Sequence, residues 1–131
     1  MINKLAKEVH RNAVEHGWWE EERSFGDIIA LCHSELSEAL EEHRNGRKPN
    51  DTYYKCSAGQ TYDDCPLRDG DSVVCCDCGP TKPEGTPSEM ADVIIRILDY
   101  CGKEGIDIDE AIHIKHEYNK SRPYRHGGKV I

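Results

Sequence analysis

The stretch HSELSEALEE, residues 33–42, decides the fold of this chain, because it combines a helical pattern with acids on the apolar side of that helix. Glu35 and Glu38 stand three residues apart, so both side chains lie on one face. At about 100° per residue, that face also carries the apolar residues Ile28, Leu31, Cys32 and Ala39. A carboxylate directed toward an apolar interior is unfavourable unless it is paired or binds a metal ion.

A second stretch, SEMADVII at residues 88–95, repeats this arrangement with Glu89 and Asp92. Apolar residues cover most of the remaining circumference up to Tyr100, which predicts a buried helix. Two buried helices that each direct a pair of acids inward predict a site for a hard cation. Two alternatives stay open: the acids form a solvated face, or Glu89 belongs to a capping box that begins at Thr86.

The two acidic pairs resemble the signature of a known family. Glu35-x-x-Glu38 followed by Glu89-x-x-Asp92 is similar to the motif of the MazG-like all-α nucleoside triphosphate pyrophosphohydrolases. The segments Lys115-x-x-Tyr118-Asn119-x-x-Arg122 and Gly127-Gly128-Lys129 resemble the C-terminal nucleotide-contacting segment of that family. The resemblance covers about residues 1–46 and 83–131 and leaves out the middle of the chain.

This resemblance implies an all-α fold, a four-helix MazG-like bundle completed by oligomerisation as a homodimer or homotetramer. It implies one pyrophosphohydrolase domain over residues 1–131 that cleaves a nucleoside triphosphate into a monophosphate and pyrophosphate, as in nucleotide pool cleaning. Mg²⁺, with Mn²⁺ as a substitute, prefers carboxylate oxygens and bridges to phosphates. The expected metal ligands are Glu35, Glu38, Glu89 and Asp92, and the expected substrate contacts are Lys115, Asn119, Arg122, Trp18 and Lys129.

The general base of such a reaction stays open. Members of the family often carry a further acid directly before the first motif glutamate, and this chain has Ser34 there. Glu38, Glu42 and a hydroxide held by the metal are the alternatives, with Glu38 and Glu42 as the candidate catalytic side chains.

Composition limits the partners of the protein. A formal net charge of −8 over 131 residues argues against a nucleic-acid polymer as the main partner. A nucleotide remains compatible, because Mg²⁺ can bridge carboxylates and phosphates. No run approaches the roughly 20 apolar residues that span a bilayer, and the N-terminus lacks a signal-peptide core, so we expect a cytoplasmic protein without membrane contact.

Periodicity predicts four helices. The first covers residues 2–16 and ends at Gly17, and the second runs from the N-cap Ser24 to residue 44. The third covers residues 87–101, and the fourth runs from about residue 107 to 122. The inner face of the fourth changes from apolar to polar along its length, ending with Lys115, Tyr118, Asn119 and Arg122. Trp18 and Trp19 follow the first helix, either as core anchors or as a stacking wall for a nucleobase.

Residues 47–83 form a cysteine-rich insert with no helical period, predicted as irregular apart from short strands near 52–54 and 71–75. Four thiolates could fold such a segment around structural Zn²⁺. The predicted ligands are Cys56, Cys65, Cys76 and Cys78, with Cys75 as a spare. Free thiols, or disulfides formed on oxidation, are the alternatives.

Two rival functions follow from the same features. In the first, the protein is a non-catalytic zinc-binding or interaction module, and the helices only carry the insert. In the second, the helices hold a ferritin-like di-iron site. That chemistry usually uses Glu-x-x-His pairs, and neither Glu35 nor Glu89 is followed by histidine at that spacing.

Overall fold

The fold is described from a computed structural model, which describes residues 1–62, 68–69, 72–75 and 79–130. The chain divides into two compact units. One unit comprises Met1–Glu22 and Leu98–Ile131, and the other comprises Arg23–Ile97. The long helix α3, Thr86–Glu104, contributes its first part to the second of these units and its last part to the first.

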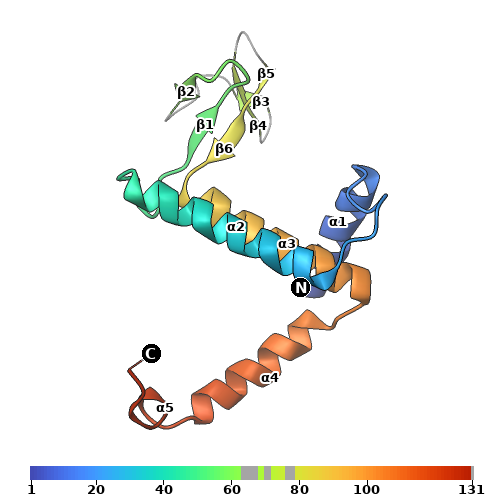
Figure 1. The fold of residues 1–131 in the computed structure, drawn as a ribbon, viewed down its shortest axis with the longest axis vertical. Coiled ribbons are helices and arrows are strands. Elements are labelled where there is room, and N and C mark those ends of the chain that lie inside the picture. Colours follow the sequence, from blue (N-terminus) through green and yellow to red (C-terminus); the bar gives the residue numbers. More distant parts are fainter. Residues whose placement is uncertain (63–67, 70–71, 76–78, 131) are drawn as a thin grey trace. The chain divides into compact units, whose positions relative to one another are not determined.

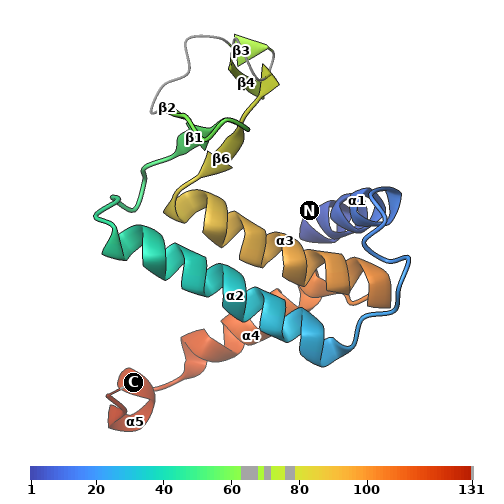
Figure 2. The same cartoon turned by 45° about the horizontal axis from the view of Figure 1, so that its top comes forward.

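In the unit formed by residues 23–97, helix α2, Phe25–Arg44, lies beside the first part of α3 (Figures 1 and 2). The predicted start of α2 is confirmed by a capping box. Ser24 Oγ accepts a hydrogen bond from Asp27 N at 3.1 Å, and Asp27 Oδ2 accepts one from Ser24 N at 3.3 Å. The buried side of α2 contains Ile28, Cys32, Glu35 and Ala39.

The insert contains more strand than the sequence predicts. β1 (Tyr53–Lys55) pairs antiparallel with β2 (Thr61–Tyr62) and with β6 (Lys82–Glu84), forming a sheet in the order β2-β1-β6. A second small sheet has the order β3-β4-β5, with bounds Arg68–Asp69, Ser72–Cys75 and Gly79–Pro80. β1 and β4 confirm the short strands predicted near residues 52–54 and 71–75. The prediction of an irregular insert was wrong for β2, β3, β5 and β6, because pairing between distant residues leaves no short-range period.

The other unit contains α1 (Ile2–Glu15), the end of α3, α4 (Ile108–Ser121) and the short α5 (Arg125–Gly128). Its core consists of Ala6, Leu98 and Cys101, against which Ile2, Val9 and Ile108 pack. Asp107 caps α4 by accepting a hydrogen bond from Glu110 N at 3.0 Å, close to the predicted start of that helix.

The predicted end of the third helix at residue 101 was wrong by three residues, since α3 continues to Glu104. The reason is the role of Gly102, because a glycine at this point of a helical pattern usually marks the end of the helix. A Cβ at this position would lie 2.5 Å from Ala6 O and 2.7 Å from His10 Cβ. Glycine therefore lets α1 pass close to α3, and the left-handed residue after the helix is Gly105, with φ of +66°.

The prediction that the third helix is buried was also wrong within the single chain. Met90, Ile94, Ile95 and Ile97 are all more than two-fifths exposed, and Ile94 reaches 55%. Leu36 and Leu40 on α2 are similarly exposed. The apolar circumference thus forms a surface of the chain, whereas the predicted acids Glu35 and Glu89 are buried.

The chain is mostly helical, with four long helices and small antiparallel sheets in its middle segment, so the predicted helical class holds at this level. Within the described part of the chain, no helix is both long and apolar enough to cross a bilayer.

Candidate cation site

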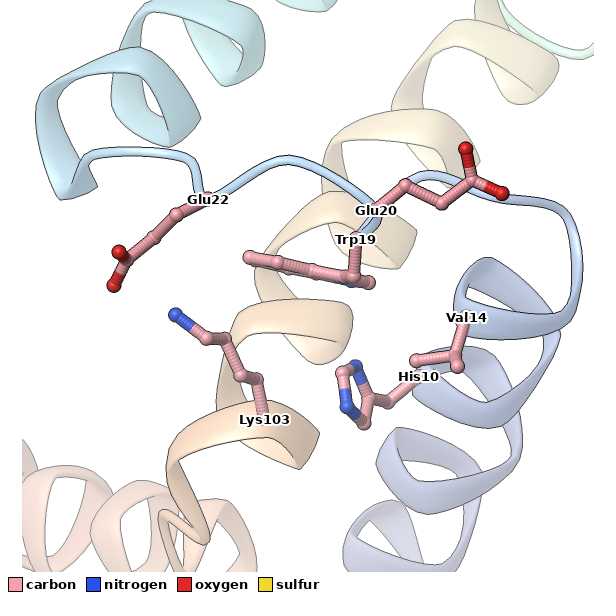
Figure 3. A pocket seen from close by; sticks show the side chains of 6 residues that line it. All are labelled: His10, Val14, Trp19, Glu20, Glu22 and Lys103. Carbon is pink, nitrogen blue, oxygen red and sulfur yellow. The ribbon is translucent and has the colours of Figure 1, made fainter.

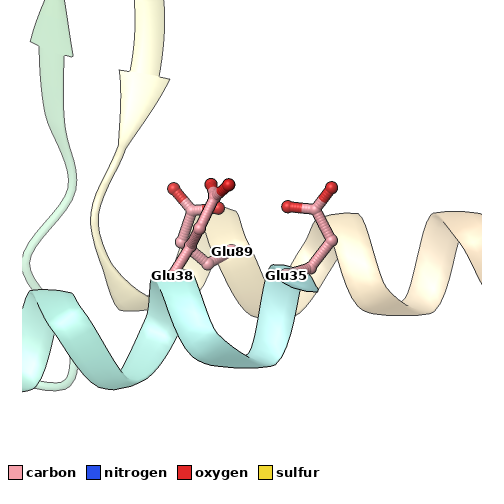
Figure 4. A group of neighbouring side chains, drawn as sticks. All are labelled: Glu35, Glu38 and Glu89. Carbon is pink, nitrogen blue, oxygen red and sulfur yellow. The ribbon is translucent and has the colours of Figure 1, made fainter. Parts of the chain in front are cut away.

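Three glutamates from two helices meet in the unit formed by residues 23–97. Glu35 and Glu38 project from α2, and Glu89 projects toward them from the first turns of α3 (Figure 4). One carboxylate oxygen from each of the three lies within 4.8 Å of the other two. The helical spacing of three residues places the first two acids on one side of α2, and the adjacent helix supplies the third.

Glu89 is the most deeply buried of these acids, with 3% of its surface exposed. Its Oε2 atom has no hydrogen-bond partner among the described residues. Burial, followed by a hydrogen bond with Glu38 and the negative charge of Glu38, raises the pKa of Glu89 to about 7. A buried carboxylate with an unpaired oxygen is unfavourable by itself, so this position needs a positive partner or a proton.

Glu35 has such a positive partner in Arg96, which lies seven residues after Glu89 on α3. Arg96 Nη2 lies 2.6 Å and Arg96 Nε 2.7 Å from Glu35 Oε1. Both donors therefore converge on the same carboxylate oxygen. Arg96 was not among the site residues predicted from the sequence. Its spacing of seven residues from Glu89, two helical turns, was the signal that could have identified it.

The fourth predicted ligand, Asp92, is half-buried on α3. Burial raises its pKa, and the charge of Glu35 adds to that effect. Three of the four predicted ligands therefore meet in one group, with Glu35 and Glu89 buried and Glu38 exposed, whereas Asp92 is not a member of that group.

A second group of acids adjoins the first and shares Glu89 with it. Glu42 of α2, Glu84 of β6 and Glu89 also offer oxygens within 4.8 Å of one another. Tyr53 Oη donates a hydrogen bond to Glu42 Oε1 at 2.8 Å, and Lys82 Nζ lies 3.2 Å from Glu84 Oε1. Glu84 was not identified from the sequence, because it ends a strand directly after the insert and meets the helices only through the tertiary fold.

The donor set fits a hard divalent cation. All the groups that converge here are carboxylates, which Mg²⁺, Mn²⁺ and Ca²⁺ prefer over nitrogen or sulfur ligands. The buried unpaired oxygen of Glu89 is the structural feature that such an ion would satisfy. Arg96 and Lys82 are positive partners of Glu35 and Glu84 in the two groups.

The predicted substrate-binding residues of the C-terminal segment belong to the other compact unit. Lys115 and Asn119 are exposed on α4, Arg122 follows its last residue, and Lys129 is exposed after α5. Lys115 Nζ lies 5.0 Å and Arg122 Cζ 5.8 Å from the centre of the Tyr118 ring. Two cations thus flank one aromatic ring, while their contact with a substrate stays a prediction.

The two tryptophans, Trp18 and Trp19, lie in different environments. Trp18 is 56% exposed, whereas Trp19 lines a cavity of about 340 Å³ together with His10 and Lys103 (Figure 3). Trp19 Nε1 donates to both carboxylate oxygens of Asp99, at 3.0 and 3.1 Å, and His10 Nδ1 lies 2.7 Å from Asp99 Oδ1. The sequence favoured Trp18 for substrate binding, and the structure offers Trp19 as the tryptophan at a cavity.

The zinc prediction falls mostly on residues that the structure does not describe. Cys56 is buried after β1 and is a free thiol in the described structure. Cys65, Cys76 and Cys78 lie outside the described residues, and for the spare, Cys75, only its place in β4 is described.

No family model, curated protein or solved structure matches this chain.

Proposed function

We propose that the protein is a Mg²⁺-dependent nucleoside triphosphate pyrophosphohydrolase that releases a nucleoside monophosphate and pyrophosphate. The observation that carries this proposal is the convergence of Glu35, Glu38 and Glu89 from two helices, together with the buried and unpaired Oε2 atom of Glu89. The resemblance of the two acidic pairs to the MazG-like motif supports the choice of substrate class.

In this proposal Glu35, Glu38, Glu89 and Asp92 hold the divalent cation. When bound, Mg²⁺ supplies neutralisation of the triphosphate and acidification of the attacking water. Arg96 keeps one oxygen of Glu35 engaged and fixes the orientation of that carboxylate. An acidic cluster of this kind has little affinity for a polyanion by itself, so substrate binding requires the cation.

Glu38 and Glu42 are the candidates for removing a proton from the attacking water. Glu42 already accepts a hydrogen bond from the Tyr53 hydroxyl through Oε1, which makes that oxygen a weaker base. Glu38 is exposed and so can reach water directly. These contacts favour Glu38 as the base, with Glu42 in a supporting role.

Lys115, Asn119, Arg122 and Lys129 are proposed to contact the phosphates and sugar of the substrate. The cavity at Trp19 offers a flat indole wall for a nucleobase. Trp18, which is exposed in the same connection, is the alternative residue for stacking on the nucleobase.

We further propose that a second copy of the chain covers the exposed apolar residues of α2 and α3, in a homodimer or homotetramer. Leu36, Leu40, Met90 and Ile94 are between 45% and 57% exposed on these two helices. Isologous packing of one such face on its equivalent is the commonest way in which a small subunit buries it.

The test is pyrophosphate release from a panel of nucleoside triphosphates, with Mg²⁺ and with EDTA, under reducing conditions. We expect Mg²⁺-dependent release that Glu38→Gln lowers by more than ~100-fold, beyond the loss seen when outer-shell partners of a metal are removed. Glu41→Gln is the matched control, since Glu41 is an exposed neighbour on α2 outside both acidic groups. No release with any nucleotide, from a folded protein that binds zinc, would instead favour the non-catalytic module.

A further inference from the structure

We propose that Glu42, Glu84 and Glu89 form a second divalent-cation position, next to the position formed by Glu35, Glu38 and Glu89. The inference rests on the proposed function in that it treats the acidic cluster as a cation site. It adds a ligand, Glu84, that is not part of the motifs on which the resemblance rests, and it makes Glu89 the residue that both positions share.

The backbone around Glu84 fixes its place beside α3. Glu84 is the last residue of β6 and pairs with Tyr53 of β1 in the antiparallel register. A single residue, Gly85, separates it from the start of the helix. Gly85 is buried with φ of +111°, and a Cβ there would collide with Asp51 O. Glycine is therefore required for the chain to turn here, and the turn sets Glu84 beside Glu89.

The hydrogen bonds of the other two ligands leave room for a cation. The contact of Tyr53 with Glu42 uses Oε1 of that carboxylate, and the contact of Lys82 with Glu84 also uses Oε1. A carboxylate has two oxygens with about four acceptor positions, so each acid retains capacity for a metal ion. These contacts also restrict the rotamers of both side chains, which reduces the reorganisation that binding requires.

The spacing and the unpaired atom point to a ligand. Oxygens bound to one Mg²⁺ or Ca²⁺ at roughly 2.0–2.6 Å lie at most about 4–5 Å apart, and the three oxygens here lie within 4.8 Å. Only 3% of the surface of Glu89 is exposed, and its Oε2 has no hydrogen-bond partner in the described part of the chain. One buried acid therefore faces two groups of carboxylates with an oxygen unsatisfied.

The experiment counts Mn²⁺ ions bound to the full chain, because Mn²⁺ prefers oxygen ligands and its free form is measured by electron paramagnetic resonance. In reducing buffer we expect two ions per chain for the wild type. Glu84→Gln should lower the affinity of one position at least tenfold and leave the other unchanged. Glu38→Gln should do the same to the other position, and the control Glu41→Gln should leave both intact. Glu42→Gln repeats the test without altering the insert.

A single ion per chain in the wild type, or two ions with unchanged affinities in both Glu84→Gln and Glu42→Gln, would overturn the second position. Because the readout is ion binding, it is separate from activity. Two bound ions without pyrophosphate release would overturn the proposed reaction and support the second position. Pyrophosphate release with one bound ion would support the reaction and overturn the second position. Circular dichroism of each variant establishes that the ion count is taken on folded protein.

Discussion

Two groups of carboxylates in this molecule have opposite surroundings. At the meeting of α1 and α4, Asp109 accepts hydrogen bonds from Ile2 N and Asn3 N at 3.1 and 3.0 Å. The bond from the Asn3 backbone is the largest cause that lowers the pKa of Asp109. In the other unit, Glu89 is buried with one oxygen unpaired, and its pKa is raised to about 7.

The contrast separates carboxylates that hold the structure together from carboxylates available to a ligand. Helix α1 has no side-chain cap of its own, and Asp109 supplies an acceptor to its first free N–H groups. Glu89 and its neighbours instead crowd negative charge together and leave an acceptor unused. A cluster that weakens the fold without a cation is expected to gain from binding one.

The largest expected effect comes from Glu89→Gln, because this acid belongs to both groups. The amide keeps the volume and removes the shared negative ligand, so pyrophosphate release should fall by more than ~100-fold. The metal-free variant should unfold at the same temperature as the wild type or higher at pH 8. Turnover near the wild-type level would mean that Glu89 has a structural role like that of Asp109 and does not bind the cation.

The second effect is a pH dependence with an unusual sign. The pKa of Glu89 is raised from 4.5 to about 7, so the folded state favours the protonated form. The stabilisation is complete below about pH 4.5 and is lost as pH rises through 7, on the order of 2–3 kcal/mol in the metal-free protein. Urea unfolding in EDTA between pH 5 and 8 measures it, with Glu89→Gln as the control that should flatten this contribution.

A third, smaller effect concerns Arg96. Arg96→Gln removes the guanidinium that pairs with Glu35, whose side chain is only 10% exposed. Since the Arg96 side chain is itself 32% exposed, we expect a loss of about 1–2 kcal/mol in the free energy of unfolding. Mg²⁺ should restore more stability to this variant than to the wild type, because a cation replaces the lost charge. If Mg²⁺ stabilises both proteins equally, Glu35 is not a ligand of the cation.

The smallest effect tests the other side of the comparison. Asp109→Ala removes the acceptor of Ile2 N and Asn3 N, so thermal unfolding should shift down by a few degrees while Mn²⁺ binding keeps its affinity and stoichiometry. Glu110→Ala, at the exposed neighbouring position, is the matched control. Weakened Mn²⁺ binding by Asp109→Ala would mean that these carboxylates are not purely structural.

Short-range features of the sequence determined the helices and much of the acid cluster. The period of apolar residues placed four helices, Ser24 caps α2 as predicted, and α4 begins close to its predicted start at residue 107. The same period placed Glu35 on the buried side of α2. These features depend on residues three or four apart, which a helix brings together whatever the rest of the chain does.

Only the tertiary structure decided the contacts between distant segments. Arg96 pairs with Glu35, and Glu84 reaches Glu89 from a strand. The helical spacing of Arg96 aligns it with Glu89 but does not indicate that Glu35 is its partner, and no local pattern marks Glu84. Gly102 similarly reads as a helix end, whereas its missing Cβ admits the backbone of α1. Strand pairing and helix approach depend on which surfaces meet in space, and the period of a single segment carries no information about its partner.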